Sequence, residues 1–71
     1  MAREEIQSTH IQAVEYDQSI LNLTVYFKTG AAYDYYPFYE NQYADFLKAE
    51  SKGSWFTKNV KNNKSIRFKK K

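Results

Sequence analysis

Lysine and arginine recur through the last third of the chain, and their spacing favours contact with phosphate groups. Residues 51–71 contain eight Lys and Arg residues and no acid, whereas residues 1–50 contain all eight Asp and Glu residues. Cations that neutralise phosphates give a salt-dependent, sequence-independent affinity for nucleic acid. Two other interpretations remain open: a solvated charged end, or a segment that partly neutralises the acidic half of the chain. We predict a nucleic-acid-binding site that includes Lys58, Lys61, Lys64, Arg67 and Lys69.

Tyrosine is the second residue type that could bind nucleic acid, because bases stack on exposed aromatic rings. Seven of the 71 residues are tyrosine. We assign Tyr26 and Tyr36 as stacking candidates and place Tyr33 and Tyr35 in the core, on the alternation described below. Exposed tyrosine is also common in strands through β-propensity alone. The aromatic signal is therefore weaker than the basic one.

The sequence offers little for catalysis or metal binding. His10 is the only histidine and cysteine is absent, so a metal site would need scattered carboxylates. A serine nucleophile would need His10 near Ser51 or Ser54 with an orienting acid, and no motif indicates this arrangement. We predict that the protein is not an enzyme and has no catalytic residues, no metal site and no cofactor.

A β-hairpin over residues 21–36 must position these side chains. Apolar and polar residues alternate through LNLTVYF and again around Asp34, which is the period of a half-buried strand. A three-residue loop of Lys28-Thr29-Gly30 puts glycine at the left-handed position of a bulge turn. This register places Asp34 opposite Thr24 on an open face, whereas a two-residue loop would bury the carboxylate.

The favoured register divides the hairpin into two faces, because cross-strand partners point the same way. On the covered face, Val25 pairs with Tyr33 and Leu23 pairs with Tyr35. The members of that face are Leu23, Val25, Phe27, Tyr33 and Tyr35. The side chains predicted to face water are Asn22, Thr24, Tyr26, Asp34 and Tyr36.

One more strand is predicted before the hairpin. Residues 9–16 alternate with a change of phase that indicates a β-bulge near Ala13-Val14. Asp17-Gln18-Ser19 supplies the turn into the hairpin. Pro37 ends the third strand because it lacks a backbone donor. These short connections predict a three-stranded antiparallel meander.

Helical periodicity begins after Pro37. Residues at i, i+4, i+7 and i+8 form the apolar stripe of a helix of about three turns: Tyr39, Tyr43, Phe46 and Leu47. Ser51-Lys52-Gly53 indicates its end, and Ser54 is predicted to cap a short second helix. Residues 66–68 are predicted as a last extended piece. The fold class is therefore α+β: a three-stranded antiparallel β-meander packed on one face by an α-helix and a short second helix.

We divide the chain into a flexible leader (1–8), one domain (9–68) and a basic tail (69–71). A chain of 71 residues without cysteine forms one small domain whose core depends on aromatic side chains. No apolar run approaches the roughly 20 residues of a membrane span, and the start lacks the apolar region of a signal peptide. We expect a soluble, cytoplasmic protein without membrane contact.

Several short patterns recur here in a characteristic order. They are Val14-Glu15-Tyr16-Asp17, Leu23-x-Val25-x-Phe27 with Gly30, Tyr33-x-Tyr35, then Tyr43, Phe46, Leu47, Ala49-x-Ser51-x-Gly53 and Phe56. In these residues, from Ser8 to Val60, the chain resembles the KTSC domain family. Tyr39 departs from the pattern, since the family usually has a proline there. The resemblance implies a small module of unknown function, found alone in bacterial and phage proteins and at the C-terminus of some lysyl-tRNA synthetases.

That attachment to a tRNA synthetase suggests RNA as the partner. We therefore expect a small non-catalytic module that binds RNA, or nucleic acid generally, through the basic C-terminal third. The alternative is a protein-interaction or self-associating phage or prophage accessory domain, with a homo-oligomer formed through the open sheet face or a strand edge. A contiguous positive surface favours the first function, and a large two-fold apolar contact favours the second.

Overall fold

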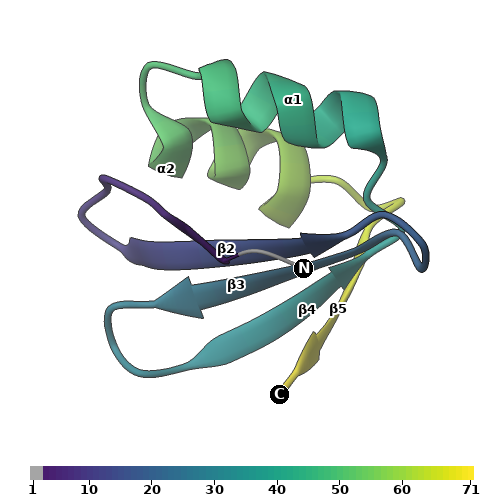
Figure 1. Ribbon diagram of the computed structural model, residues 1–71, viewed down its shortest axis with the longest axis horizontal. Coiled ribbons are helices and arrows are strands. Elements are labelled where there is room, and N and C mark those ends of the chain that lie inside the picture. The colour runs from purple at the N-terminus through teal and green to yellow at the C-terminus, as the bar shows by residue number, and fades with distance from the viewer. Residues whose placement is uncertain (1–2) are drawn as a thin grey trace.

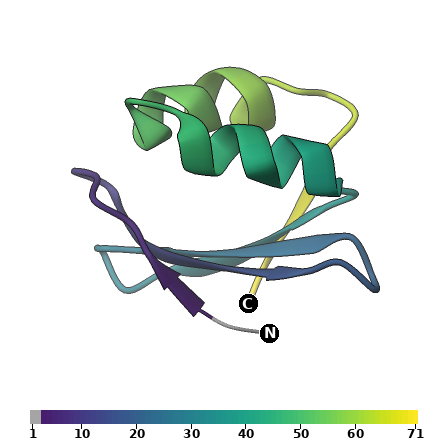
Figure 2. The same ribbon diagram turned by 45° about the horizontal axis from the view of Figure 1, so that its top comes forward.

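An antiparallel sheet of five strands carries the fold, and the helices lie together on one of its faces (Figure 1). The structure, a computed structural model, describes residues 3–71. The strands are β1 Arg3–Glu5, β2 Ile11–Asp17, β3 Asn22–Phe27, β4 Ala32–Tyr36 and β5 Arg67–Lys70. They lie in chain order across the sheet, so β1 and β5 form its two opposite edges. Figure 2 shows the same two layers, with the helices above the sheet.

The α+β class is confirmed, but the expected three strands are wrong, because the sheet has five. β1 lies within the predicted flexible leader, where Arg3 pairs with Glu15 of β2. β5 includes Lys69 and Lys70, which we had placed in a basic tail. Both edge strands are short and highly charged, so neither shows the alternation that identifies a strand. The first two residues of the leader lie outside the described part of the chain.

The register of the hairpin is confirmed. Val25 pairs with Tyr33 and Leu23 pairs with Tyr35. The backbone N–H of Phe27 donates to the carbonyl of Ala31 at 2.8 Å, and Gly30 has a φ of 97°. That left-handed conformation favours glycine, which is why this residue can close the loop. The predicted β-bulge in β2 is also present, as a register shift between Ile11 and Ala13.

The sheet face away from the helices is less open than predicted. Thr24 is only 5% exposed, and Ala13 beside it is fully buried. Asn22, Tyr26 and Asp34 are half-buried, and only Tyr36 of the predicted set is exposed. This face is more buried than predicted because the sheet has two additional strands, β1 and β5. Their long side chains lie over a face that a three-stranded sheet would leave bare.

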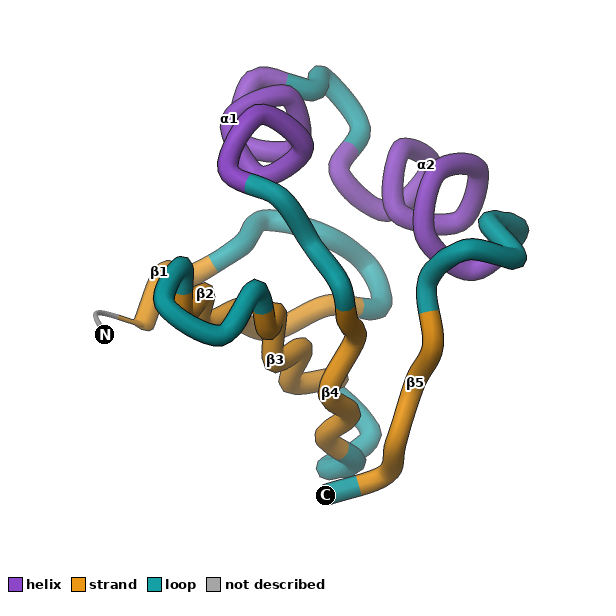
Figure 3. The backbone as a smooth tube through the Cα atoms, turned by 90° about the vertical axis from the view of Figure 1, so that its right-hand side faces the viewer, coloured by secondary structure: helices purple, strands orange, loops and turns teal. Residues whose placement is uncertain are grey.

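The helices cover different parts of the sheet. α1 spans Glu40–Lys48, and α2 spans Lys52–Phe56 and continues as a π-helical turn, η1, over Thr57–Lys61. Tyr43 of α1 stacks on Tyr16 of β2, with ring centroids 4.7 Å apart. Phe56 of α2 meets Tyr35 of β4 edge to face at 5.0 Å. Figure 3 shows the same division, with α1 toward β1 and α2 toward β5.

The ends of the helices differ from the prediction. Ser51, rather than Ser54, caps α2: its Oγ accepts a hydrogen bond from the backbone N–H of Ser54 at 3.4 Å. Gly53 lies inside the first turn of α2 and does not end α1. A Cβ atom on Gly53 would lie 3.1 Å from Oγ of Ser8. Glycine therefore allows α2 to approach the loop between β1 and β2 closely.

Aromatic side chains dominate the core between the two layers. Phe38, Phe46 and Phe56 are almost fully buried, and the hydroxyl of buried Tyr16 donates to the carbonyl of Phe38 at 2.7 Å. The predicted helical stripe is correct at Phe46 but not at Tyr39 and Leu47. Tyr39 precedes the helix and is 50% exposed, and Leu47 is 38% exposed. Phe38, which precedes the helix, is fully buried instead, and its ring meets those of Tyr16 and Trp55 at 5.9 and 6.3 Å. Within residues 3–71, no helix has the length and apolar character needed to cross a membrane.

Candidate nucleic-acid interface

β5 forms a basic edge of the sheet, and its alternating side chains point to both faces. Phe68 lies opposite Tyr35 and Lys70 lies opposite Tyr33, so both belong to the helix side. Arg67 and Lys69 lie opposite Tyr36 and Asp34, on the other side. Residue 71 extends the pairing, since the backbone N–H of Lys71 donates to Ala32 at 2.9 Å. The predicted tail is thus a paired strand that places cations on both faces of the edge.

A groove of about 660 Å³ lies on the helix side of β5, between η1 and the sheet. We call it the β5 groove. Its apolar lining includes Phe27, Tyr33, Val60, Ile66 and Phe68. Lys61 and Lys64 also line it, and Nζ of Lys61 lies 5.6 Å from the centroid of the Phe27 ring. The groove therefore combines aromatic surface with cations, which are the two features that single-stranded nucleic acid requires of a protein.

The structure distributes the predicted site residues over separate places. Lys61 and Lys64 line the β5 groove, whereas Lys58 lines a second groove next to the loop between β1 and β2. Arg67 and Lys69 lie on the opposite face of β5, where Arg67 pairs with Tyr36. The placement of Arg67 and Lys69 follows from strand alternation, which the sequence pattern did not reveal because β5 itself was not predicted in full. Lys58 and Lys61 lie on the same turn, η1, but line different grooves.

Tyr26 and Tyr36 do not form a common stacking platform. They lie on the same face, but Tyr26 pairs with Ala32, four residues before Tyr36 on β4. Four residues of strand separate them by about 13 Å. Arg3 covers the ring of Tyr26, with Cζ 4.5 Å from the ring centroid. A base could reach that face of the ring only by displacing the guanidinium.

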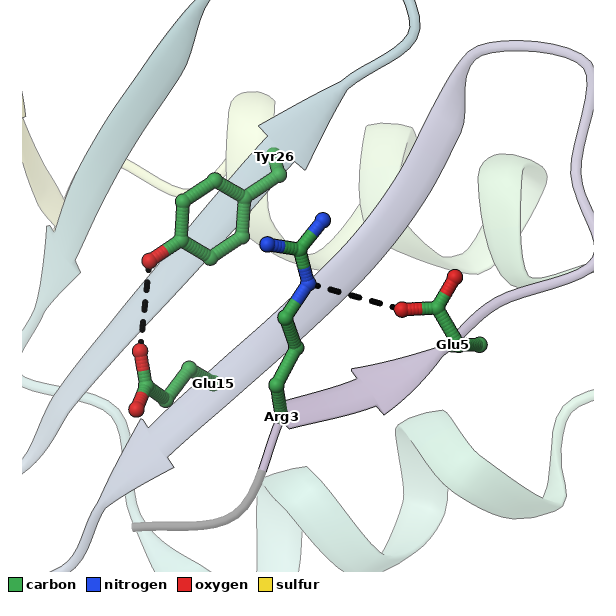
Figure 4. Close-up of polar contacts among 4 residues, drawn as sticks. All are labelled: Arg3, Glu5, Glu15 and Tyr26. Carbon is green, nitrogen blue, oxygen red and sulfur yellow. Dashed lines mark hydrogen bonds and ion pairs between the residues drawn. The ribbon is translucent and has the colours of Figure 1, made fainter.

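The surroundings of Tyr26 form a small polar cluster on β1, β2 and β3 (Figure 4). Its hydroxyl donates to Oε1 of Glu15 at 3.2 Å. Nε of Arg3 lies 3.4 Å from Oε2 of Glu5. Figure 4 shows Arg3 lying between the tyrosine ring and Glu5. The contact of Arg3 with the Tyr26 ring connects β1 to β3, and the hydrogen bond from Tyr26 to Glu15 connects β3 to β2.

Tyr33 and Tyr35 both face the helices, as predicted, but their environments differ. Tyr35 is buried, and burial, with a smaller effect of Tyr33, raises the pKa of the Tyr35 hydroxyl to about 12. Tyr33 is only half-buried, and its ring meets Phe68 edge to face at 6.2 Å. Both tyrosines line the β5 groove, but Tyr35 is buried in the core and Tyr33 is partly open to solvent. Phe68 was not among the predicted site residues. Its position between Arg67 and Lys69 in the sequence could have indicated an aromatic residue in the basic site.

Asp34 lies opposite Lys69 of the basic strand β5, and it is held in a hydrogen-bonded cluster. Its Oδ1 accepts from the hydroxyl of Thr24 at 2.6 Å and from the side-chain amide of Asn22 at 3.1 Å. Burial opposes ionisation of Asp34, but these two donors, with Lys71 and Lys69 nearby, bring its pKa below the ordinary value. The same contacts explain why Thr24 can be buried without an unsatisfied hydroxyl.

Replacing Asp34 by asparagine is expected to remove a pH-dependent part of the stability. Because the pKa of Asp34 is lower in the folded than in the unfolded chain, its contribution is complete above the unfolded value of about 3.9. It disappears as the pH falls from there through the folded pKa. At about pH 6 the variant should lose up to about 1.5–3 kcal/mol, the range for hydrogen bonds to a charged group.

Urea unfolding of wild type and Asp34→Asn, followed by circular dichroism, measures this difference. The two stabilities should converge as the pH falls below about 4 and through the lower folded pKa. Asp45→Asn, at an exposed position of α1, is the matched control and should track wild type at each pH. A constant difference between Asp34→Asn and wild type across this range would contradict the prediction.

The second groove, of about 470 Å³, is polar. Its lining includes His10, Ser51 and Ser54 together with Glu50 and Lys58. Ser51 is already engaged as the cap of α2. Within residues 3–71, no hydrogen bond joins His10 to either serine, and no three His, Asp or Glu side chains are arranged to hold a metal ion.

The two edge strands of the sheet carry opposite net charge. Glu4 and Glu5 lie on β1, whereas the four residues of β5 include three cations. In the described part of the chain, the side-chain ion pair within 4.0 Å is Arg3 with Glu5. No such pair joins the basic segment to an acid there. The basic segment is therefore not engaged with the acidic half of the chain through close ion pairs.

Two comparisons with known proteins agree with each other. Residues 7–63 match the sequence model of the KTSC domain. The crystal structure of a KTSC domain protein from Yersinia pestis is similar in fold, with a TM-score of 0.90 and 26% sequence identity. The similarity covers 99% of this chain and 96% of that chain. No curated protein matches the chain.

Proposed function

The chain belongs to the KTSC domain family, and we propose that it is a non-catalytic module that binds RNA along its β5 edge. The observation that carries this proposal is the placement of cations around one strand. Arg67 and Lys69 lie on one face of β5, Lys70 lies on the other, and Lys61 and Lys64 line the adjacent groove. An extended polyanion could contact cations on both sides of this edge.

Electrostatics supports the proposal in two ways. The acids of β1 are at the far edge of the sheet, so they do not face a ligand bound at β5. The basic residues also make no close ion pair with an acid within residues 3–71, so they need not break one to bind phosphate. Phosphate neutralisation releases condensed counterions and gives affinity without sequence preference. We propose cytoplasmic RNA as the ligand.

The affinity for single-stranded RNA is expected to fall steeply with salt. Fluorescence anisotropy with labelled oligouridine should give a log–log slope of about −0.7 for each phosphate neutralised. The double variant Lys61→Glu/Lys64→Glu should bind more weakly and flatten the slope by about 0.7 for each lost contact. All RNA sequences should be affected alike, because phosphate contacts carry no sequence information.

The matched control is Lys48→Glu/Lys52→Glu, which changes the net charge by the same amount at the end of α1 and the start of α2. If both double variants lose affinity equally, net charge rather than the β5 edge accounts for binding. If wild type has no RNA affinity even at low salt, the proposal is wrong. A protein-interaction or self-associating module would then be the function to test, by measuring the oligomeric state.

A further inference from the structure

We propose that the β5 groove binds an unpaired base, so that the protein selects single-stranded RNA over duplex RNA. This inference rests on the RNA-binding function proposed above and specifies its ligand. Phosphate contacts alone would not distinguish the two kinds of RNA so sharply, because both present a charged backbone. The groove adds a surface that only a base freed from pairing can reach.

Phe68 supplies that surface. It is 68% exposed, although it lies beside the aromatic residues Tyr33 and Tyr35 of β4. Its ring centroid lies 6.2 Å from the ring centroids of both Tyr33 and Tyr35. The phenyl ring thus continues the row of aromatic rings from the core to the edge of the sheet, where it remains exposed to solvent. An exposed ring at the end of such a cluster can stack on any base, since every base has a π-face.

The charges around the groove suit a nucleotide. Lys61 and Lys64 line it, and Lys70 lies on the same face of β5 as Phe68. No Asp or Glu is among the residues that line the groove in the described part of the chain. A base between the aromatic side chains would therefore leave its phosphates near lysine ammonium groups, with no carboxylate opposing them.

The groove is also large enough for a single nucleotide. Its volume of about 660 Å³ lies within the range of about 300–1,000 Å³ for small-ligand pockets. Duplex RNA keeps its bases stacked and paired inside a helix, and proteins reach unpaired bases mainly in single strands, loops and bulges. An RNA duplex could contact the lysines at the rim, but it could not place a base against Phe68.

The test compares two labelled RNAs: an oligouridine of about 12 nucleotides and a blunt duplex of the same length. Phe68→Ala should weaken binding of the single strand about 5- to 150-fold, which corresponds to one stacked base. Its effect on the duplex should be less than about 2-fold, and the salt slope for the single strand should not change. Phe68→Trp should retain single-strand affinity, since it keeps an aromatic face.

Tyr39→Ala is the matched control, because Tyr39 is a 50% exposed aromatic residue at the start of α1, away from the groove. It should bind both RNAs like wild type. Circular dichroism establishes that each variant is folded. If Phe68→Ala binds the single strand as wild type does, or loses both RNAs equally, the base site is excluded while the RNA-binding function stands. If wild type binds neither RNA, the proposed function fails and the base site fails with it.

Discussion

Val25→Asp is expected to unfold the protein. Val25 lies at the centre of β3, is fully buried, and pairs with Val14 on one side and Tyr33 on the other. A carboxylate there would have no cation or hydrogen-bond donor to compensate for its lost hydration. Burying an unpaired charge costs at least about 4 kcal/mol. A chain of this length has a total stability of only about 4–11 kcal/mol.

A thermal melt followed by circular dichroism measures this effect. The control is Gln12→Asp, which introduces the same carboxylate at an exposed position of β2. This variant should lose no more than about 1 kcal/mol, the span of β-propensity. Thr24→Asp, next to Val25 in β3, is not a suitable control, because Thr24 is buried and its hydroxyl donates to Asp34. Equal melting temperatures for Val25→Asp and Gln12→Asp would show that the inner and outer positions had been assigned wrongly.

Phe46→Ala should have the second largest effect. Phe46 is the fully buried residue of α1, and it belongs to the core cluster that includes residues of the sheet. Its ring also meets that of Trp55 in α2 at 5.5 Å, so it connects the two helices. Removing a buried phenyl ring costs about 3–5 kcal/mol through lost burial and the cavity that remains. A large part of the total stability would be lost, and unfolding should occur at a much lower urea concentration.

Leu47 provides a control on the same helix. It is the next residue along α1, and it is 38% exposed. Leu47→Ala should therefore cost less than about 1 kcal/mol, partly because alanine favours the helix. The pair also tests a difference between sequence and structure, since the helical stripe had assigned both residues to the core. Similar losses in the two variants would favour the stripe over the observed packing.

The sequence by itself determined the hairpin and its register. Local alternation placed Leu23 and Val25 on one face, Gly30 identified the loop, and the need to keep Asp34 out of the core excluded the other loop length. The structure has this pairing. Such features can be predicted from the sequence because each depends on residues that are neighbours in the chain. The family was recognisable for the same reason, from short patterns in a characteristic order.

Only the tertiary structure decided where the candidate site lies. β5 pairs with β4 across about half the chain, as Tyr36 with Arg67 shows. A pairing over that separation leaves no periodic signal in four residues as charged as RFKK. It nevertheless divides the cations between two faces and brings Phe68 beside Tyr33. The groove exists because η1 and β5 meet the β3–β4 hairpin there. A site built from segments so far apart in the chain cannot be read from either one alone.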